Sequence, residues 1–189
     1  MIPPVSMKLV ILDRDGVVNR DSDQYIKSPL EWIPLPGALK AVARLTNAGY
    51  TIAIASNQSG LARGLFDVDT LNWIHQALRL RAAALGGRID LIAFCPHGPA
   101  DQCQCRKPLP GLLEEIARRF SLSLEGVPMI GDALRDLEAA RRVGAWPILV
   151  RTGKGAQTAA ELPPAFRDTA IAADLAGAVD LILSGAGPR

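Results

Sequence analysis

Apolar residues along the chain fall into two alternating patterns. Short, nearly continuous apolar runs, such as KLVIL at 8–12 and TIAIA at 51–55, predict buried strands. Longer segments between them have helical spacing, as in 37–50, where Gly49 marks the expected end of the helix. This reading predicts strands at 8–12, 51–55, 89–94, 127–130, 146–150 and 169–173, and helices at 37–50, 67–85, 110–121, 133–143 and 174–183.

Alternation of strands and helices predicts an α/β fold with one open, mostly parallel, Rossmann-like sheet that carries helices on both faces. In such folds, functional sites lie beyond the carboxyl ends of the strands. Asp67 or Asp69 is expected to cap the helix 67–85, and the Pro-containing stretch 152–167 is expected to be a surface loop. A length of 189 residues suits one domain, so we expect a single domain over 1–189.

Composition and charge narrow the class of protein. Hydrophobic residues make up 49% of the chain and charged residues 21%, as in ordinary globular proteins. A net charge of +2 and 5% aromatic residues give no reason to expect nucleic acid as a partner. The apolar runs are too short to span a bilayer, and residues 1–6 lack the pattern of a signal peptide. We therefore expect a cytoplasmic protein without a membrane partner, and we expect a monomer because nothing in the sequence demands an oligomer.

The first candidate for chemistry is the segment LDRDG at 12–16, directly after a predicted strand. Alternate residues of an extended segment point the same way, so Asp13 and Asp15 can face one site while Arg14 faces elsewhere. Gly16 permits a sharp turn. Two carboxylates side by side repel each other, which favours a divalent cation such as Mg²⁺ between them. A strand followed by an ordinary polar turn is the alternative explanation.

Further candidates follow other predicted strands. ASNQSG at 55–60 combines a hydroxyl, amide side chains and a glycine-permitted turn, which together can hold an anion. Lys107 comes after the strand 89–94 and its loop, and in IGDALRD Asp132 ends a strand with Asp136 one helical turn later. Each has a plainer explanation when taken alone: a strand-to-loop turn or, for Asp132, a helix cap.

Taken together and in this order, over residues 8–151, the motifs resemble the haloacid dehalogenase superfamily of phosphohydrolases, which use an aspartate nucleophile. The resemblance implies that Asp13 attacks phosphorus to form an aspartyl-phosphate. It implies that Asp15 protonates the leaving oxygen and then activates the hydrolytic water. It also implies a catalytic Mg²⁺ held by Asp13, the backbone carbonyl of Asp15, and Asp132.

The same resemblance assigns the groups that bind phosphate. Ser56 and the amides around Asn57 are expected to hold phosphoryl oxygens, and Lys107 is expected to offset the charge on nucleophile and phosphate. Asp136 is expected to act either through the water shell of the metal or by contacting Lys107 directly. Response-regulator receivers also phosphorylate an aspartate, but a receiver needs neither Asp15 nor the cysteine-rich loop that follows.

All three cysteines of the chain lie in CPHGPADQCQC at 95–105. Cys95, His97, Cys103 and Cys105 form the Cys₃His set of a structural zinc site, in which four protein ligands close the coordination sphere. Free thiols or a redox pair formed by the CxC segment are the alternatives. A zinc module that binds nucleic acid or protein is a further one, but it leaves the carboxylates without a function and predicts a more basic, aromatic-rich face.

The zinc loop 95–107 narrows the resemblance to a small, capless branch of the superfamily. This branch includes the D-glycero-D-manno-heptose 1,7-bisphosphate 7-phosphatases and the histidinol-phosphate phosphatases. NQSGLARG at 57–64 and VRTGKG at 150–155 resemble the heptose bisphosphate phosphatases. The expected function is therefore Mg²⁺-dependent removal of the 7-phosphate from that small phosphosugar, in lipopolysaccharide precursor synthesis, with histidinol phosphate as the alternative substrate.

Substrate contacts are expected by analogy with the same branch. Asn19, Asp21 and Arg106 are expected to contact sugar hydroxyls or the distal phosphate. Arg63 is a further basic candidate for the distal phosphate, with a solvated surface position as the alternative. Some heptose phosphatases carry a lysine directly after the metal-binding Asp, where this chain has Ala133. Arg135 can replace that lysine only if the geometry places its guanidinium at the site.

Overall fold

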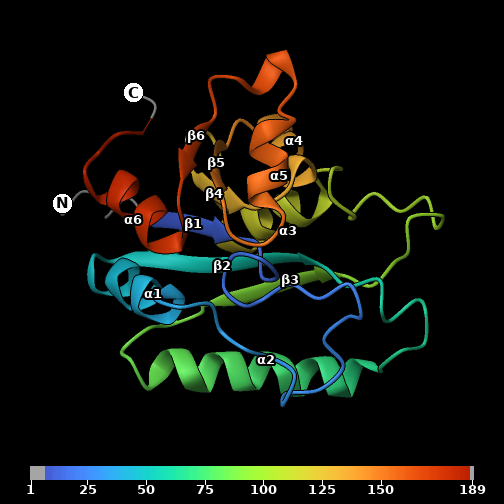
Figure 1. Cartoon of the computed structure of the whole chain (residues 1–189). Coiled ribbons are helices and arrows are strands. Elements are labelled where there is room, and N and C mark those ends of the chain that lie inside the picture. The colour runs from blue at the N-terminus through green and yellow to red at the C-terminus, as the bar shows by residue number, and fades with distance from the viewer. Residues whose placement is uncertain (1–6, 188–189) are drawn as a thin grey trace.

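The computed structural model describes residues 7–187 and contains a six-stranded sheet in the order β3-β2-β1-β4-β5-β6 (Figure 1). Every neighbouring pair is parallel. The strands are β1 Lys8–Leu12, β2 Tyr50–Asn57, β3 Leu91–Cys95, β4 Pro128–Gly131, β5 Trp146–Val150 and β6 Ala170–Ala172. The predicted fold class is thereby confirmed. Residues 1–6, where we expect no signal peptide, and 188–189 lie outside the described range.

Helices cover both faces of the sheet (Figure 1). They are α1 Ala38–Asn47, α2 Val68–Ala83, α3 Gly111–Phe120, α4 Leu134–Arg142, α5 Gly155–Ala160 and α6 Leu175–Leu183, with a short 3-10 turn at Pro164–Phe166. One apolar core joins α1, α2 and α6 to the sheet, and a second joins α3 and α4 to the opposite face. The sheet is therefore buried on both sides, as its near-continuous apolar strands require.

A local signal sets the start of α2. Asp67 caps α2, because its side chain accepts a hydrogen bond from the backbone N–H of Thr70 at 2.8 Å. Helix α5, within the stretch expected to be a loop, is a difference from the sequence prediction. Its sequence GAQTAA has no apolar period, and the helix is held by tertiary contacts: the Thr158 hydroxyl donates to the Asp132 carbonyl at 2.9 Å.

The strands are parallel, so their carboxyl ends lie at the same end of the sheet, and the arrowheads of β1, β2 and β3 point to the right in Figure 1. The chain order reverses at β1, which pairs with β2 on one side and β4 on the other. Such a switch point is where parallel α/β sheets place their ligands. Between β1 and α1 the described chain contains only isolated bridges, Asp15 to Asn19 and Asn19 to Pro34, and no cap element.

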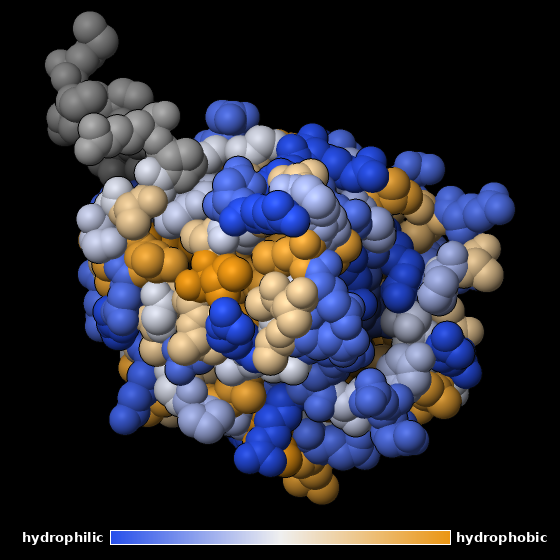
Figure 2. Space-filling view, turned by 45° about the horizontal axis from the view of Figure 1, so that its top comes forward, coloured by the Kyte–Doolittle hydropathy of each residue, from blue (hydrophilic) through white to orange (hydrophobic). Residues whose placement is uncertain are grey.

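The surface does not narrow the class of protein further. On the face in Figure 2, hydrophilic residues cover most of the area and apolar residues gather in a band near its centre. None of the helices in residues 7–187 combines the length and the apolar character that crossing a membrane requires.

Candidate active site

Asp13 and Asp132 are brought together by the pairing of β1 with β4. Leu12 lies opposite Ile130, and the N–H of Asp13 donates to the Ile130 carbonyl at 2.8 Å. Each aspartate follows its strand directly, so both side chains emerge at the same point. Carboxylate oxygens of Asp13, Asp132 and Asp136 all lie within 4.8 Å of one another, and all three residues are buried.

Lys107 is the buried cation of this cluster. Its Nζ lies 3.0 Å from Asp13 Oδ1 and 2.7 Å from Asp136 Oδ1, and it donates to the Ala55 carbonyl at 2.7 Å. Burial lowers the pKa of Lys107, but the carboxylates of Asp13 and Asp136 outweigh it, so the net shift is upward. Asp136 thus contacts Lys107 directly, one of the two arrangements expected for it.

The carboxylates fit a divalent cation. Burial, and then the charge of Asp136, raises the pKa of Asp13 to about 6 despite Lys107. Burial and the charges of Asp13 and Asp136 raise the pKa of Asp132 to about 7. Asp132 Oδ1 is buried without a hydrogen-bond partner in the described part of the chain. Clustered, desolvated oxygens with one lone carboxylate atom are the ligands that Mg²⁺ takes.

Two glycines from distant segments flank Asp132. A Cβ atom on Gly16 would lie 2.0 Å from Asp132 Oδ2, and one on Gly153 would lie 2.2 Å from it. Gly16 also has a φ of +83°, which L-residues rarely adopt. The two segments are joined by the Thr152 hydroxyl, which donates to the Gly16 carbonyl at 2.7 Å, and the Lys154 N–H donates to Asp132 Oδ2 at 2.8 Å.

The Asp15 carboxylate lies outside the aspartate cluster. Arg14 donates a hydrogen bond to each of its oxygens, from Nε to Oδ1 at 3.0 Å and from Nη2 to Oδ2 at 2.9 Å. Asn19 Nδ2 donates to Oδ1 at 2.8 Å, and Gln58 Nε2 donates to Oδ2 at 3.0 Å. Only the backbone of Asp15 was expected to hold the metal. Its side chain lines the cavity, with both oxygens held by these donors.

The segment after β2 forms a second set of contacts. Gln58 Nε2 also bonds the Ser56 hydroxyl at 2.7 Å, so Ser56 and Asp15 share one amide. Asn57 Nδ2 donates to the Lys107 carbonyl at 3.0 Å, and the Lys107 N–H donates to Asn57 Oδ1 at 3.1 Å. Asn57 therefore fixes the backbone of residue 107 and aims its side chain at Asp13. Gln58 was not among the predicted site residues, although it stands inside the ASNQSG segment.

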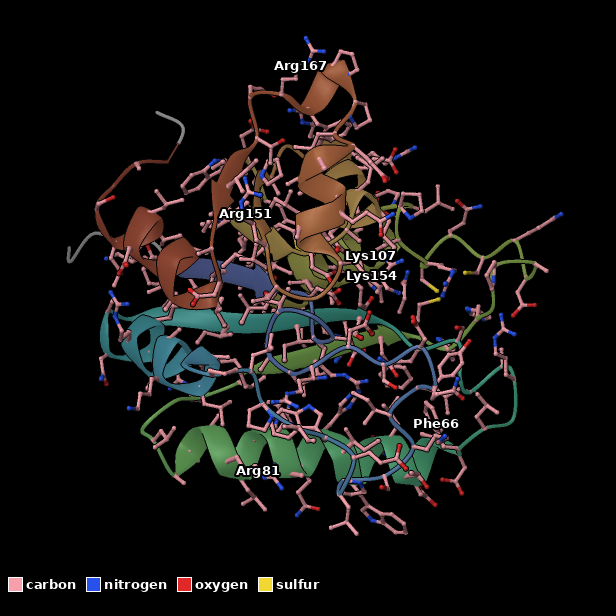
Figure 3. The ribbon with its side chains drawn as sticks, viewed as in Figure 1. Phe66, Arg81, Lys107, Arg151, Lys154 and Arg167 are labelled. Atoms are coloured by element: carbon pink, nitrogen blue, oxygen red, sulfur yellow. The ribbon has the colours of Figure 1, made fainter. Side chains whose placement is uncertain are left out.

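A cavity of about 220 Å³ opens above these groups. Of the sequence-predicted residues, Asp13, Asp15, Asp21, Asn57 and Arg106 line it. The lining also includes Tyr25, Gln58, Arg135 and Lys154. The lining therefore carries four cationic side chains, those of Arg14, Arg106, Arg135 and Lys154. Arg135 is the one whose placement the sequence left open. In the view of Figure 3, Lys107 and Lys154 both lie toward the end of the sheet at which β1 and β2 end.

Two predicted substrate contacts lie off the cavity. Asn19 is fully buried and bonds Asp15 and the Arg20 carbonyl, so it supports the carboxylate from behind. Arg63 is exposed, and its guanidinium lies 5.9 Å above the ring of Tyr25. Lys154, absent from the predicted contacts, has its Nζ 3.2 Å from Asp21 Oδ2. Its signal in the sequence is the lysine of VRTGKG, between two glycines.

The predicted zinc ligands converge into one cluster. Cys95 Sγ lies 3.1 Å from Cys105 Sγ and 3.6 Å from Cys103 Sγ, and His97 Nδ1 lies 3.3 Å from Cys105 Sγ. Edges of about 3.8 Å separate sulfurs around a tetrahedral zinc, so a small expansion would accept the ion. Burial raises the pKa of Cys95 to about 12 and also raises the pKa of Cys105. At Cys103 burial acts in the same direction, but hydrogen bonds outweigh it and the net shift of the pKa is downward.

This cysteine loop also holds Arg106. The Nη1 atom of Arg106 donates to the His97 carbonyl at 3.2 Å, while its side chain lines the active-site cavity. A residue that faces the substrate pocket is thus anchored to a backbone atom between the thiol ligands.

Comparison with known proteins adds independent information. The HAD-hydrolase-like family model matches residues 104–178. The chain is 56% identical to the D-glycero-beta-D-manno-heptose-1,7-bisphosphate 7-phosphatase of Bordetella bronchiseptica, over 95% of this chain and 100% of that relative. It is 49% identical to the relative of the same name from Pseudomonas aeruginosa, over 95% of this chain and 99% of that relative.

A solved structure agrees with the sequence relatives. The crystal structure of the D,D-heptose 1,7-bisphosphate phosphatase from B. bronchiseptica, complexed with magnesium and phosphate, matches with a TM-score of 0.91 and 55% identity. The match covers 95% of this chain and 99% of that one. The chain belongs to the haloacid dehalogenase-like phosphatases, which are phosphoric monoester hydrolases, within the family of the heptose-1,7-bisphosphate 7-phosphatases.

Proposed function

We propose that this chain removes the 7-phosphate of D-glycero-D-manno-heptose 1,7-bisphosphate in a Mg²⁺-dependent reaction, in the cytoplasmic supply of lipopolysaccharide heptose. The observation that carries the proposal is Asp13, a buried carboxylate 3.0 Å from Lys107 Nζ that faces a cavity rimmed by Arg106, Arg135 and Lys154. A bisphosphate needs one anion site at the nucleophile and another at the mouth. The similarity to heptose bisphosphatases supports the same substrate.

In the first step, an Asp13 oxygen attacks phosphorus while the bond from phosphorus to the sugar oxygen breaks. Asp15 gives its proton to that oxygen, which leaves as the sugar hydroxyl. In the second step, Asp15 takes a proton from water as the water attacks the aspartyl-phosphate, which releases inorganic phosphate and restores Asp13. Arg14, Asn19 and Gln58 hold the Asp15 carboxylate in place for both transfers.

Phosphoryl oxygens are held by the Ser56 hydroxyl and by Lys107, which keeps the positive charge next to the nucleophile. Bound Mg²⁺, with Asp13, the Asp15 carbonyl and Asp132 as its protein ligands, supplies charge neutralisation between the anionic nucleophile and the anionic phosphate. Zinc in the cysteine loop is structural, because four protein ligands leave no open position for substrate.

Phosphate release from matched substrates tests the proposal. Both anomers of heptose 1,7-bisphosphate are compared with histidinol phosphate and an aryl phosphate, with Mg²⁺ and after its removal by a chelator. We expect the highest kcat/KM for one heptose anomer and near-complete loss of turnover without Mg²⁺, restored when Mg²⁺ is added. A higher kcat/KM for histidinol phosphate would move the assignment to the alternative substrate, and full activity in chelator would remove the Mg²⁺ requirement.

A further inference from the structure

Residues 21–25, called the wall segment below, form one side of the active-site cavity. Asp21, Ser22, Asp23 and Tyr25 line this cavity of about 220 Å³. Three of the same residues, Asp21, Ser22 and Tyr25, also line a second cavity of about 420 Å³. A single segment of chain therefore separates the substrate pocket from the outer cavity.

The backbone of the wall segment gives it little support. Among residues 7–187, its backbone hydrogen bonds stay within the segment, as from the Ser22 N–H to Asp21 Oδ1 at 2.8 Å and from the Tyr25 N–H to the Ser22 carbonyl at 3.1 Å. Tyr25 has a φ of +62°, which residues with a Cβ atom rarely adopt. Such a conformation persists only where the surrounding structure holds it.

Two cationic side chains from separate loops contact the wall segment. Lys154 lies between β5 and α5, and its Nζ is 3.2 Å from Asp21 Oδ2 and 3.6 Å from Asp23 Oδ1. Arg63 lies between β2 and α2, and its guanidinium is 5.9 Å from the centre of the Tyr25 ring, within the range of a cation–π contact. Each end of the segment thus contacts one cation.

Both cations extend from backbone that is fixed at the active site. The Lys154 N–H donates to Asp132 Oδ2 at 2.8 Å. The Arg63 N–H donates to the Ser59 carbonyl at 3.1 Å, and Ser59 lines the cavity. The two side chains therefore connect the catalytic end of the sheet to the wall segment.

We propose that Lys154 and Arg63 are positioning residues that hold the wall segment against the sugar of the substrate. Lys154 acts through the carboxylates of Asp21 and Asp23. Arg63 acts through the ring of Tyr25. This inference rests on the proposed function, because it assigns the wall segment to a phosphosugar. The two contacts give the pocket a fixed side where residues 7–187 contain no cap element.

The charges near Lys154 favour this role over a direct contact with the distal phosphate. The carboxylates of Asp21 and Asp23 stand beside one ammonium group, so an anion placed there meets net negative charge. Burial lowers the pKa of Lys154, but the charge of Asp21 outweighs it, and the net shift is upward. Lys154 therefore stays charged and paired. Arg106 and Arg135, which also line the cavity, remain for the distal phosphate.

Kinetics on two sugar phosphates test the positioning role. Lys154→Met and Arg63→Met each release one end of the wall segment, so KM for heptose 1,7-bisphosphate should rise about fivefold. KM for heptose 7-phosphate, which lacks the distal phosphate, should rise by the same factor, and kcat for both should change less than about twofold. Lys154→Arg keeps the cation and should recover most of the loss. Lys27→Met, at a lysine that lines the outer cavity, is the matched control.

Asp21→Asn tests whether Lys154 acts through its carboxylate partner. It should raise KM in the wild-type background and have no further effect in Lys154→Met, because both changes remove the same contact. A lysine that instead bound the distal phosphate would be freed by Asp21→Asn, which would lower KM for the bisphosphate alone. That result, or full additivity of the two changes, would overturn the proposal.

Hydrogen exchange measures the wall segment without any substrate. Its amides should exchange faster in Lys154→Met and Arg63→Met than in the wild type and in Lys27→Met. Unchanged exchange in both variants, or unchanged KM in both, would overturn the positioning role. A wild type that is inactive on both heptose phosphates, with variants that exchange faster, would overturn the proposed function and still support the hold of the two cations on the wall segment.

Discussion

Two clusters of candidate metal ligands stand at the same end of the sheet and are built in opposite ways. The aspartates of the first come from two strand ends and a helix, far apart in the sequence, and offer only oxygen atoms. The second cluster spans eleven residues of one loop, Cys95 to Cys105, and offers sulfur and nitrogen. Oxygen ligands suit Mg²⁺, whereas thiolates and imidazole suit zinc.

This difference distinguishes a cluster that can act on substrate from one that stabilises the structure. The aspartate cluster gains its position from the sheet, already has a lysine inside it, and leaves Asp132 Oδ1 open toward a cation. The thiol cluster has a full set of ligands and no lining position in the catalytic cavity except through Arg106. A ligand set assembled by the fold can act on substrate, whereas a ligand set assembled by one loop creates local structure.

The largest effect is expected at the aspartate cluster. Asp13→Asn keeps the size of the side chain but removes the nucleophile, so kcat should fall by more than about four orders of magnitude with the fold retained. Phosphate release and circular dichroism measure the two properties. A folded variant whose kcat is within a hundredfold of wild type would move the nucleophile elsewhere.

Removal of the cation inside the same cluster comes next. Lys107→Met should lower kcat about 10²–10³-fold. It should also lower the free energy of unfolding by about 3–5 kcal/mol at neutral pH, because Asp13 and Asp136 then face each other without compensation. Denaturant titration measures the second quantity.

A double variant separates these two effects of Lys107. Adding Asp136→Asn to Lys107→Met removes one of the opposed charges and should recover stability without recovering kcat. Recovery of both would mean that Lys107 serves only to balance charge within the fold.

The thiol cluster should behave differently. Cys103→Ser should abolish stoichiometric zinc, lower the melting temperature by about 5 °C or more, and reduce kcat/KM only about 10–100-fold, because the loop loses its hold on Arg106 and Lys107. Gln104→Ser, at the exposed position between two ligands, is the control. Full activity in a zinc-free variant would separate the loop from catalysis, and a loss as deep as that of Asp13→Asn would erase the contrast between the clusters.

The last prediction concerns the residue that links the two clusters, where only KM is expected to change. Arg106→Ala should raise KM for a bisphosphate about 10–100-fold, the value of a charge-assisted contact, with kcat and aryl phosphate hydrolysis nearly unchanged. Arg88→Ala, an exposed arginine before β3, removes the same charge as a control. A fall in kcat with constant KM would place Arg106 at the reacting phosphate and not at the distal one.

The sequence predicts those features of the fold and the site that depend on the spacing of apolar residues or on a residue's position at the end of a strand. The alternating elements predict the parallel sheet. Because the carboxyl ends of parallel strands lie at the same end of a sheet, the sequence alone could group Asp13, Lys107 and Asp132. The thiol ligands are close in sequence, so their spacing alone indicates a cluster. Helix α5 was missed because its six residues have no apolar face and depend on Asp132 for their place.

Side-chain partners are harder to anticipate, because they depend on rotamers and on residues far along the chain. Arg14 was expected to face away from its neighbours, yet its fork returns to Asp15. Asn57 was expected to contact phosphate and does line the cavity, and its side-chain amide also bonds a backbone that lies fifty residues later. No pattern in ASNQSG distinguishes a side-chain amide that binds substrate from one that hydrogen-bonds the backbone of another segment.

The contact between Asn57 and residue 107 has a consequence for protein engineering. Asn57 recognises one N–H and one carbonyl, which every amino acid except proline supplies. Asn57 therefore fixes the position of residue 107 whatever side chain that residue carries. A lysine analogue introduced at 107, such as a photocaged or isotope-labelled one, should be delivered to the same point beside Asp13, which makes this position suitable for a light-triggered or spectroscopic handle on the buried carboxylates.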